Sequence, residues 1–461
     1  MKHNCLFQKE EINRGLLDFL DKSPVSFYAV SNMRQMLDAA GAERLLEGTR
    51  WELEPGGMYY VTRNDSALIA FRLPADGDAN GSGTMAGFQI IASHCDSPFF
   101  KIKTNAQITS EKNYLTLNIE KYGGMICESW FDRPLSAAGR IVVRTPEGVE
   151  TRLVCIDRDL LIIPHLAIHM NREVNDGYKI NVQKDMMPLF AGVSADADAA
   201  QTADGAFLQL IAEEGGVRAQ DILDTDLYLY SRVRGTMLGL HNEYLASGRL
   251  DDLQCAFASL KGFLAAEVGS SIAVHCVYDN EEVGSGSKQG AASTFLKDVL
   301  HRINAALGGD EETYQQRLVN SFVISADNAH AVHPNYTEKA DPTNRPVLNG
   351  GIVIKYNASQ KYTTDAVSGA IFREICEAAE VPVQTFWNRS DQTGGSTLGN
   401  ISTSQVAVNS VDIGLPQLAM HSSYELTGAE DTVRLVKAAA IFYAASLESR
   451  GDGNYRLTMC E

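Results

Sequence analysis

The sequence has no long apolar run: no stretch of 18 residues is apolar enough to cross a membrane, and the start, Met1–Cys5, lacks the core of a secretion signal. It also has no basic run of five or more residues, and 58 acidic against 40 basic side chains give a formal net charge of -18. These absences argue against a membrane protein and against a nucleic-acid partner. Because such a charge repels acidic small molecules, an acidic substrate would need a local cation.

The eight cysteines are scattered and form no Cys-x-x-Cys pair. Without a secretion signal, this usage predicts reduced thiols and a cytoplasmic protein. With 44% hydrophobic and 21% charged residues, the composition is that of an ordinary globular protein. A chain of 461 residues is too long for one compact core, so we expect at least two domains.

Two styles of pattern divide the chain. Between about residues 98 and 234 short β-like runs dominate, at 114–119, 139–144, 151–156 and 160–163, and an Ala/Asp-rich loop covers 194–204. The flanking segments instead alternate helix and strand patterns. We therefore expect a discontinuous main domain, residues 1–97 and 235–461, with a β-rich domain, residues 98–234, inserted into it.

The flanking segments predict an α/β fold with three αβα layers around a mostly parallel sheet. A hairpin is predicted at 59–62 and 67–73, with Asn64 and Asp65 in the turn. Helical spacing predicts helices at 12–20, 26–40, 252–266, 287–303, 365–379 and 429–446. Buried strands are predicted at 88–93, 271–277, 322–326, 352–356, 383–386 and 411–413.

Glu281 and Glu282 form the most informative pair in the chain. They follow the β-branched run Ser271–Val277 and precede a glycine-rich turn, so the pattern places them at the carboxyl edge of a sheet, where α/β proteins build their sites. Successive side chains of an extended segment point in different directions. One glutamate can then bind a metal while the other moves a proton. A solvated loop is the alternative for the pair taken alone.

Further imidazoles and carboxylates stand at other element ends. His94 ends one predicted strand, Asp327 ends another, Asp251 opens a helix, and His421 follows the apolar run Gln417–Met420. Together with Glu282 they offer two imidazoles and three carboxylates, a donor set that suits two divalent ions such as Zn²⁺, Mn²⁺ or Co²⁺. The three carboxylates and one hydroxide balance the charge of two such ions.

Glu281 remains free to act as the general base. Asp96, two residues after His94, is placed to hold the other ring nitrogen of that histidine. Each residue alone also fits a structural role. These roles are a core histidine for His94, an N-cap pair for Asp251 and Asp252, the start of a turn for Asp327 and a cap of the next element for His421. Cys95, Cys255 and Cys276 lie near these positions, and we interpret them as small buried hydrophobes, not as ligands; His275 is assigned to the core.

These segments resemble the aspartyl aminopeptidase family, whose members are co-catalytic zinc exopeptidases. The resemblance runs in order from about residue 24 to residue 445 and rests on six motifs: Ser93–Pro98, Pro164–His169, Gly248–Asp252, Asp279–Gly284, Ser325–Tyr336 and Gln417–Ser422. It implies that His94 and Asp327 bind one metal, that Glu282 and His421 bind the other, that Asp251 bridges them and that Glu281 is the base. The fold it implies is zinc-exopeptidase-like, with the inserted β domain used for dimerisation and oligomerisation.

The resemblance also implies features outside the metal set. A histidine matching His169 reaches the active site of a neighbouring subunit in the family, which assembles as a twelve-subunit shell built from dimers. The family lysine matching Lys355 faces the acidic side chain of the substrate; from the pattern alone, a surface lysine fits that position equally well. Tyr424 stands where acidic-selective members carry an arginine, which weakens the case for Asp or Glu as the preferred residue.

The leading hypothesis is a metallo-aminopeptidase that removes an N-terminal residue, Asp or Glu, from peptides with a free amino terminus. It uses a hydroxide held by two metal ions, most simply zinc, and Glu281 as base. The alternatives are a family member that prefers neutral residues, a different dimetal hydrolase such as a carboxypeptidase or deacylase, and a catalytically silent shell or scaffold. No ligand position is lost in this sequence, and a loss would be the mark of a silent protein.

Overall fold

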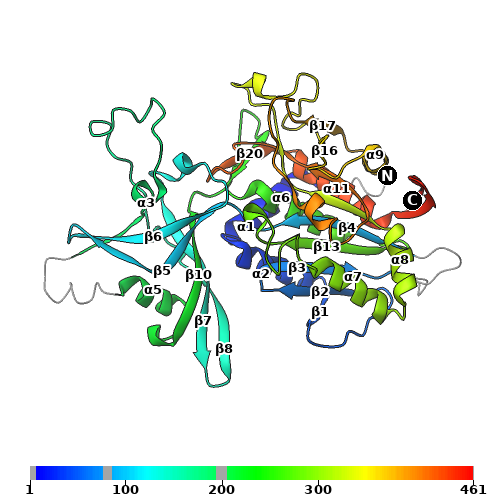
Figure 1. Cartoon of the computed structure of the whole chain (residues 1–461), viewed down its shortest axis with the longest axis horizontal. Helices are drawn as coiled ribbons and strands as arrows, with labels where there is room; N and C mark the ends of the chain where they lie inside the picture. Colours follow the sequence, from blue (N-terminus) through cyan, green and yellow to red (C-terminus); the bar gives the residue numbers. More distant parts are fainter. Residues whose placement is uncertain (1–6, 76–85, 194–204, 460–461) are drawn as a thin grey trace.

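The computed structural model describes residues 7–75, 86–193 and 205–459, so the loop at 194–204 lies outside the described residues. A nine-stranded sheet forms its centre (Figure 1). In spatial order the strands are β1 (Glu43–Arg44), β2 (Met58–Arg63), β3 (Ala67–Arg72), β13 (Ile272–Tyr278), β4 (Phe88–His94), β14 (Phe322–Ala326), β18 (Asn409–Gly414), β16 (Ile352–Tyr356) and β17 (Val383–Trp387).

The expected parallel sheet exists at the centre, where β13, β4, β14 and β18 run parallel to one another. The flanks are mixed: β3 is antiparallel to β13, and β16 is antiparallel to β18. The β2–β3 hairpin turns at Asn64 and Asp65 as predicted, with φ values of 59° and 51°. Both residue types tolerate the left-handed conformation that a tight hairpin turn requires.

Helices cover both faces of this sheet, which confirms the three-layer prediction. One core packs the sheet against α1 (Lys9–Lys22), α2 (Ser26–Ala39), α6 (Leu250–Ala265), α9 (Ala366–Ala378) and α11 (Asp431–Ala444). The second core packs the other face against α7 (Phe295–Ala306), α8 (Glu311–Val319) and α10 (Leu398–Ser402). Fully buried side chains such as Phe263, Phe295 and Phe442 each stabilise these layers by roughly 1.5–3 kcal/mol.

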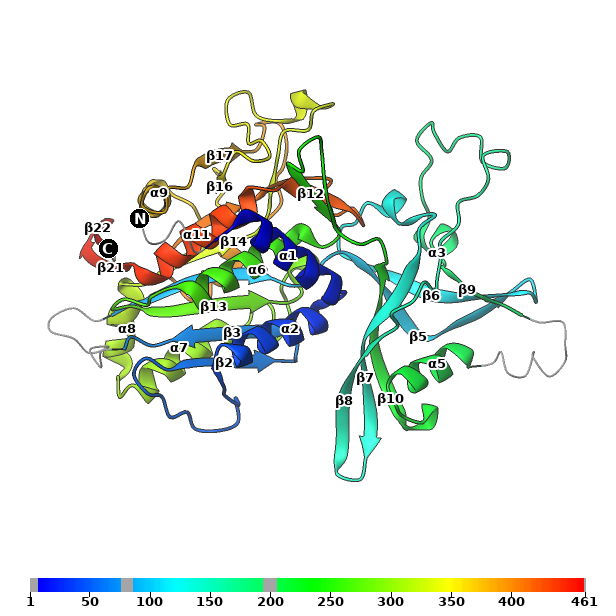
Figure 2. The same cartoon turned by 180° about the vertical axis from the view of Figure 1, so that it is seen from behind.

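A six-stranded sheet with its own hydrophobic core lies to one side of the nine-stranded sheet in both views (Figures 1 and 2). Its strands, in spatial order, are β8 (Gly148–Cys155), β7 (Leu135–Thr145), β10 (Ile222–Ser231), β5 (Phe99–Ser110), β6 (Tyr114–Tyr122) and β9 (Leu189–Gly192). Short helical segments accompany it: η3 (Cys127–Trp130), α3 (Val182–Asp185), η4 (Ala219–Asp221) and α5 (Ala206–Glu214). The boundaries at residues 98 and 234 stay a prediction.

A five-stranded sheet, absent from the sequence prediction, adjoins the region where the two larger sheets meet. It contains β11 (Thr236–Leu238), β12 (Tyr244–Ser247), β20 (Glu425–Gly428), β19 (Pro416–Leu418) and β15 (Ala329–His330). β15 follows β14 and β19 follows β18 almost directly. The five-stranded sheet is therefore built from segments that continue past the strand ends of the central sheet. The hairpin of β21 (Ser446–Gly451) and β22 (Asn454–Thr458) follows α11.

Three local predictions were wrong in detail. The helix expected at 287–303 begins only at Phe295, because the preceding segment is rich in Gly and Ser, which favour turns. Residues 160–163 form no strand; Leu161 and Ile162 make only isolated bridges. Glu281 and Glu282 lie in a 3₁₀ turn, η5 (Glu281–Val283), rather than in an extended segment. No helix in the described part of the chain combines the length and the apolar character needed to cross a membrane.

Candidate active site

The predicted metal ligands come together at the carboxyl edge of the central sheet. His94 is the last residue of β4, Asp327 follows β14 directly, and η5 follows β13. These three strands are parallel neighbours, so their carboxyl ends meet at one edge. Asp251 enters from the first turn of α6, and His421 enters from the chain after β19. Five segments far apart in sequence therefore contribute to one site.

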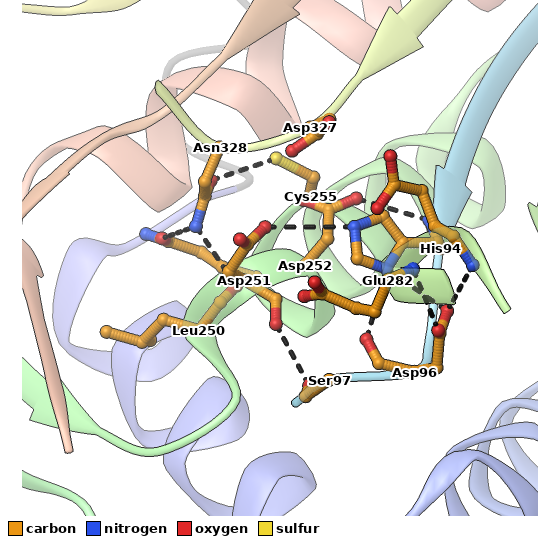
Figure 3. Close-up of polar contacts among 12 residues, drawn as sticks. His94, Asp96, Ser97, Leu250, Asp251, Asp252, Cys255, Glu282, Asp327 and Asn328 are labelled. Atoms are coloured by element: carbon orange, nitrogen blue, oxygen red, sulfur yellow. Dashed lines mark hydrogen bonds and ion pairs between the residues drawn. The ribbon is translucent and has the colours of Figure 1, made fainter. Parts of the chain in front are cut away.

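Their donor atoms form three groups, and within each group all atoms lie within 4.8 Å of one another. The groups are His94 with Asp251 and Asp327, His94 with Glu281 and Glu282, and Asp251 with Glu282 and His421. Asp251 belongs to two of them: Oδ1 lies 3.8 Å from Nε2 of His94, and Oδ2 lies 3.4 Å from Nε2 of His421. A carboxylate between two imidazoles in this way has the position of a bridging ligand. Figure 3 shows Asp251, Glu282 and Asp327 converging near His94.

The chemistry of this cluster fits two divalent cations. Oδ1 of Asp251 and Oε1 of Glu282 are buried and accept no hydrogen bond. A buried acceptor without a partner is costly unless a cation satisfies it. Imidazole and carboxylate donors suit zinc and its neighbours in the first transition row. None of the three donor groups in the described chain contains a cysteine, and Cys95, Cys255 and Cys276 are buried.

Without cations, the cluster retains protons. Burial raises the pKa of Glu281 to about 8 and that of Asp327 to about 6, and it raises the pKa of Glu282 well above its usual range. Burial lowers the pKa of His421, but the contact with Asp251 and the charge of Glu282 outweigh it and raise that pKa to about 10. Cations and protons therefore compete for the same groups.

Asp96 supports the turn that carries the two glutamates. Its two carboxylate oxygens accept the backbone N–H groups of Glu281 and Glu282, each at 3.1 Å. Nδ1 of His94 lies 3.0 Å from the backbone oxygen of Asp96 and 3.4 Å from its Oδ1. The expected contact with the ring nitrogen thus exists, with the backbone carbonyl as the nearer partner. Both oxygens of the Asp96 carboxylate accept hydrogen bonds from η5.

Two further acids, neither of them among the predicted site residues, hold the other candidate ligands. Glu425 accepts the backbone N–H of His421 at 2.7 Å and that of Asp251 at 3.2 Å. Asp252 accepts the backbone N–H of His94 at 3.2 Å. The only sequence signal for Glu425 is an acid four residues after a candidate ligand, which is too common to be informative.

Lys355 is buried at the end of β16 rather than exposed on the surface. Its ammonium donates to the backbone oxygen of Asn328 at 3.2 Å and lies 3.8 Å from Oδ2 of Asp327. It also faces the ring of Tyr362, with 5.5 Å between Nζ and the ring centroid. Burial lowers its pKa, but Asp327 and other neighbouring groups outweigh this and raise it. The lysine is therefore a buried cation at the edge of the candidate metal-binding cluster.

His169 and Tyr424 do not join this cluster. His169 is exposed on a turn between β8 and β9 and belongs to none of the three donor groups. The hydroxyl of Tyr424 donates to the backbone oxygen of Arg234 at 3.1 Å. That contact ties the loop after His421 to the chain between β10 and β11, so Tyr424 has a structural partner here.

An αβα sheet whose parallel strand ends gather imidazoles and carboxylates defines a metallohydrolase of the zinc-exopeptidase class. The chain belongs to the M18 family of aminopeptidases, because residues 19–443 match the family described as aminopeptidase I zinc metalloprotease (M18). The expected family, the α/β zinc-exopeptidase-like fold and the assignment as a metallo-aminopeptidase are thereby confirmed.

Close relatives support this membership. The chain is 46% identical over 445 residues to a probable M18 family aminopeptidase 2 of Clostridium novyi, which covers 96% of this chain and 100% of the relative. A protein of the same description from Pseudomonas aeruginosa is 42% identical over 440 residues, 95% of this chain and 99% of the relative. Among solved structures, the complex of Ape4 and Nbr1 aligns with a TM-score of 0.89 and 36% identity, over 94% of this chain and 86% of that one. A structure described as the mApe1 dodecamer of S. cerevisiae aligns with a TM-score of 0.80 and 26% identity, over 96% and 99%.

Proposed function

We propose that this aminopeptidase releases N-terminal Asp or Glu from peptides, with two metal ions and Glu281 as its proton carrier. The observation that carries the proposal is the cluster of His94, Asp251, Glu282, Asp327 and His421 around buried carboxylate oxygens that lack hydrogen-bond donors. Glu281 lies in the same cluster, and the five other residues supply enough donors without it.

The donor groups suggest how the ions divide. His94 and Asp327 would hold one ion, Glu282 and His421 the other, and Asp251 would contact both. When bound, two such ions, zinc being the simplest choice for the family, would acidify a water molecule and polarise the carbonyl oxygen of the scissile bond. The ends of β4 and β14 hold His94 and Asp327. Asp96 and Glu425 accept the backbone N–H groups of Glu282 and His421 and so fix the other pair.

Glu281 moves the proton in this mechanism. Its carboxylate accepts a proton from the attacking water and donates it to the amine that leaves. A half-buried carboxyl with a pKa near neutrality suits both directions of transfer, and desolvation raises the pKa of Glu281 to about 8. The hydrogen bond from its own N–H to Asp96 fixes the turn that carries it.

Replacement of Glu281 tests the proposal. A Glu281→Gln variant should lower kcat by roughly 10²–10⁴-fold, because the amide cannot carry the proton, while metal content stays near that of the wild type. Metal analysis and the rate on peptides with a free amino terminus measure both. Glu377→Gln, on the exposed face of α9, is the control and should match the wild type. A variant that loses metal, or keeps its rate, contradicts the assignment of Glu281 as base.

The preference for acidic residues rests on Lys355. Its ammonium is buried 3.8 Å from Asp327, a proposed ligand. A cation on Asp327 would compete with the ammonium for that carboxylate, which leaves the lysine charge available to a substrate carboxylate. The net charge of -18 otherwise repels such a group, so a local cation is needed. Preference for a neutral residue is the alternative.

Assembly and location complete the proposal. One related structure is described as a dodecamer, and we infer that this chain also forms a homo-oligomer, with His169 directed to a neighbouring subunit. The six cysteines in the described part of the chain are free, which supports a reducing, cytoplasmic setting.

A further inference from the structure

The segment Tyr122 to Gly124, which begins with the last residue of β6, leaves the six-stranded sheet and reaches the candidate active site at the edge of the central sheet. The hydroxyl of Tyr122 donates to Oδ2 of Asp96 at 2.7 Å and accepts from Nδ2 of Asn280 at 2.9 Å. Asp96 in turn holds the N–H groups of Glu281 and Glu282. One phenol of the six-stranded sheet therefore supports the turn that carries both glutamates from two sides.

Gly123 packs directly against Glu282. A Cβ atom at Gly123 would lie 3.1 Å from Cβ and 3.3 Å from the backbone oxygen of Glu282, closer than side chains normally approach. The residue also has a φ of +76°, which favours glycine. This glycine therefore allows the chain after β6 to lie beside Glu282.

Gly124 fixes the orientation of His421, which the proposed function pairs with Glu282 on one metal ion. Nδ1 of His421 lies 2.7 Å from the backbone oxygen of Gly124. A carbonyl can only accept, so Nδ1 carries a proton, and Nε2 is the nitrogen that can give up its proton and bind a cation. Nε2 is the atom that lies 3.4 Å from both Asp251 and Glu282. The hydrogen bond thus presents the correct nitrogen to a cation.

We infer that Tyr122–Gly124 is a positioning segment for the Glu282–His421 half of the metal site, and that the β-rich insertion is part of the catalytic centre as well as an assembly element. Tyr122 anchors the turn, Gly123 sets the place of Glu282, and Gly124 sets the tautomer of His421. The inference rests on the proposed function, since it concerns the metal-binding role of these two residues.

Metal titration of the metal-free protein tests the role of Tyr122. Tyr122→Phe removes one hydroxyl and keeps the ring, and it should weaken one of two zinc-binding steps by roughly 10–100-fold, the usual cost of losing such support. Competition with a chromophoric chelator measures each step. Tyr228→Phe is the matched control, because the ring centroids of Tyr228 and Tyr122 lie 5.8 Å apart and both rings pack on the same core. This variant should bind both ions like the wild type.

A second pair of variants keeps the inference testable if Tyr122→Phe folds poorly. Gly123→Ala should weaken the same zinc step, because the new methyl displaces Glu282. Gly205→Ala is its control: Gly205 has a φ of +73°, almost the same strain, and no atom within 4 Å of the added Cβ. If the wild type binds two zinc ions, and Tyr122→Phe and Gly123→Ala bind them with the same affinities, this inference is overturned while the proposed function stands. A wild type that binds no zinc would overturn the proposed function with it.

Discussion

At the scale of single residues, the site is a cluster of opposite charges held close together. Lys355 is the only one of these charges that the proposal assigns to the substrate. Lys355→Met keeps the length and apolar stem of the side chain but removes the ammonium, so kcat/KM for N-terminal Asp and Glu should fall by roughly 10²-fold or more, the cost of leaving a buried carboxylate unpaired. The rate for N-terminal Leu or Met should change far less.

The control for this prediction is Lys361→Met. Lys361 donates to the backbone oxygen of Gly394 at 2.9 Å on a neighbouring loop and has no carboxylate partner in that contact. It should leave the ratio of acidic to neutral rates unchanged. Equal losses on all substrates in Lys355→Met would show that the lysine supports Asp327 and does not select the substrate.

The sequence pointed to the candidate ligands of the site but not to the residues that hold them in place by hydrogen bonds. Ligand candidates such as His94 and Asp327 stand beside apolar strands, and the carboxyl ends of parallel strands meet by geometry alone. Tyr122 and Glu425 could not be recognised in this way, because each acts through a hydrogen bond to a segment far away in the chain. The extended geometry expected for Glu281 was wrong for a related reason: its turn is set by Asp96, 185 positions earlier.

At the scale of elements, buried strands were easy to predict because continuous β-branched runs leave few alternatives; β14 and β16 agree with the prediction at both ends. The start of α7 was predicted too early: residues 287–294 carry no apolar repeat, and the Gly and Ser residues there favour turns. The five-stranded sheet was missed because its strands have two to four residues, too short for a periodic signal.

Within the described residues, the turn that carries His169 has no contact with the metal-ligand candidates. Its base is fixed, since His165 contacts Asp132 at 2.6 Å through Nδ1 and at 2.9 Å through the backbone N–H. Its tip instead exposes Leu166, Ile168 and Met170, with 54%, 50% and 70% of their surfaces accessible. A rigid base with an apolar tip is typical of a segment that docks on another molecule.

Subunit mixing tests whether that molecule is a second copy. His169→Ala and Glu281→Gln should each be nearly inactive alone, but co-expressed subunits should recover part of the activity, because a site with an intact Glu281 can meet an intact His169 from its neighbour. Light scattering of the purified mixture confirms that mixed oligomers form. Mixed oligomers without recovered activity would place His169 outside the neighbouring site.

At the scale of the whole molecule, three sheets meet at one acidic cluster, so we expect folding and metal binding to be coupled. In the metal-free protein the pKa of Glu281 is raised from an ordinary 4.5 to about 8, that of Asp327 from 3.8 to about 6, and that of His421 from 6.5 to about 10. Between these ordinary and raised values the folded protein binds more protons than the unfolded chain. Stability must therefore fall as the pH rises through this window.

Metal removal should make this dependence visible. After chelation, the Tm should fall by at least a few degrees between about pH 5 and pH 8, since roughly 1 kcal/mol shifts the Tm of a large domain by 2–4 °C. With zinc added, cations replace the protons, and the gap in Tm between the loaded and the metal-free protein should widen toward pH 8. Thermal unfolding at several pH values, with and without zinc, measures the gap. Metal-free Glu281→Gln lacks one of the titrating groups and should show a shallower decline, whereas a gap that narrows as the pH rises would mean that these groups do not hold the protons assigned to them.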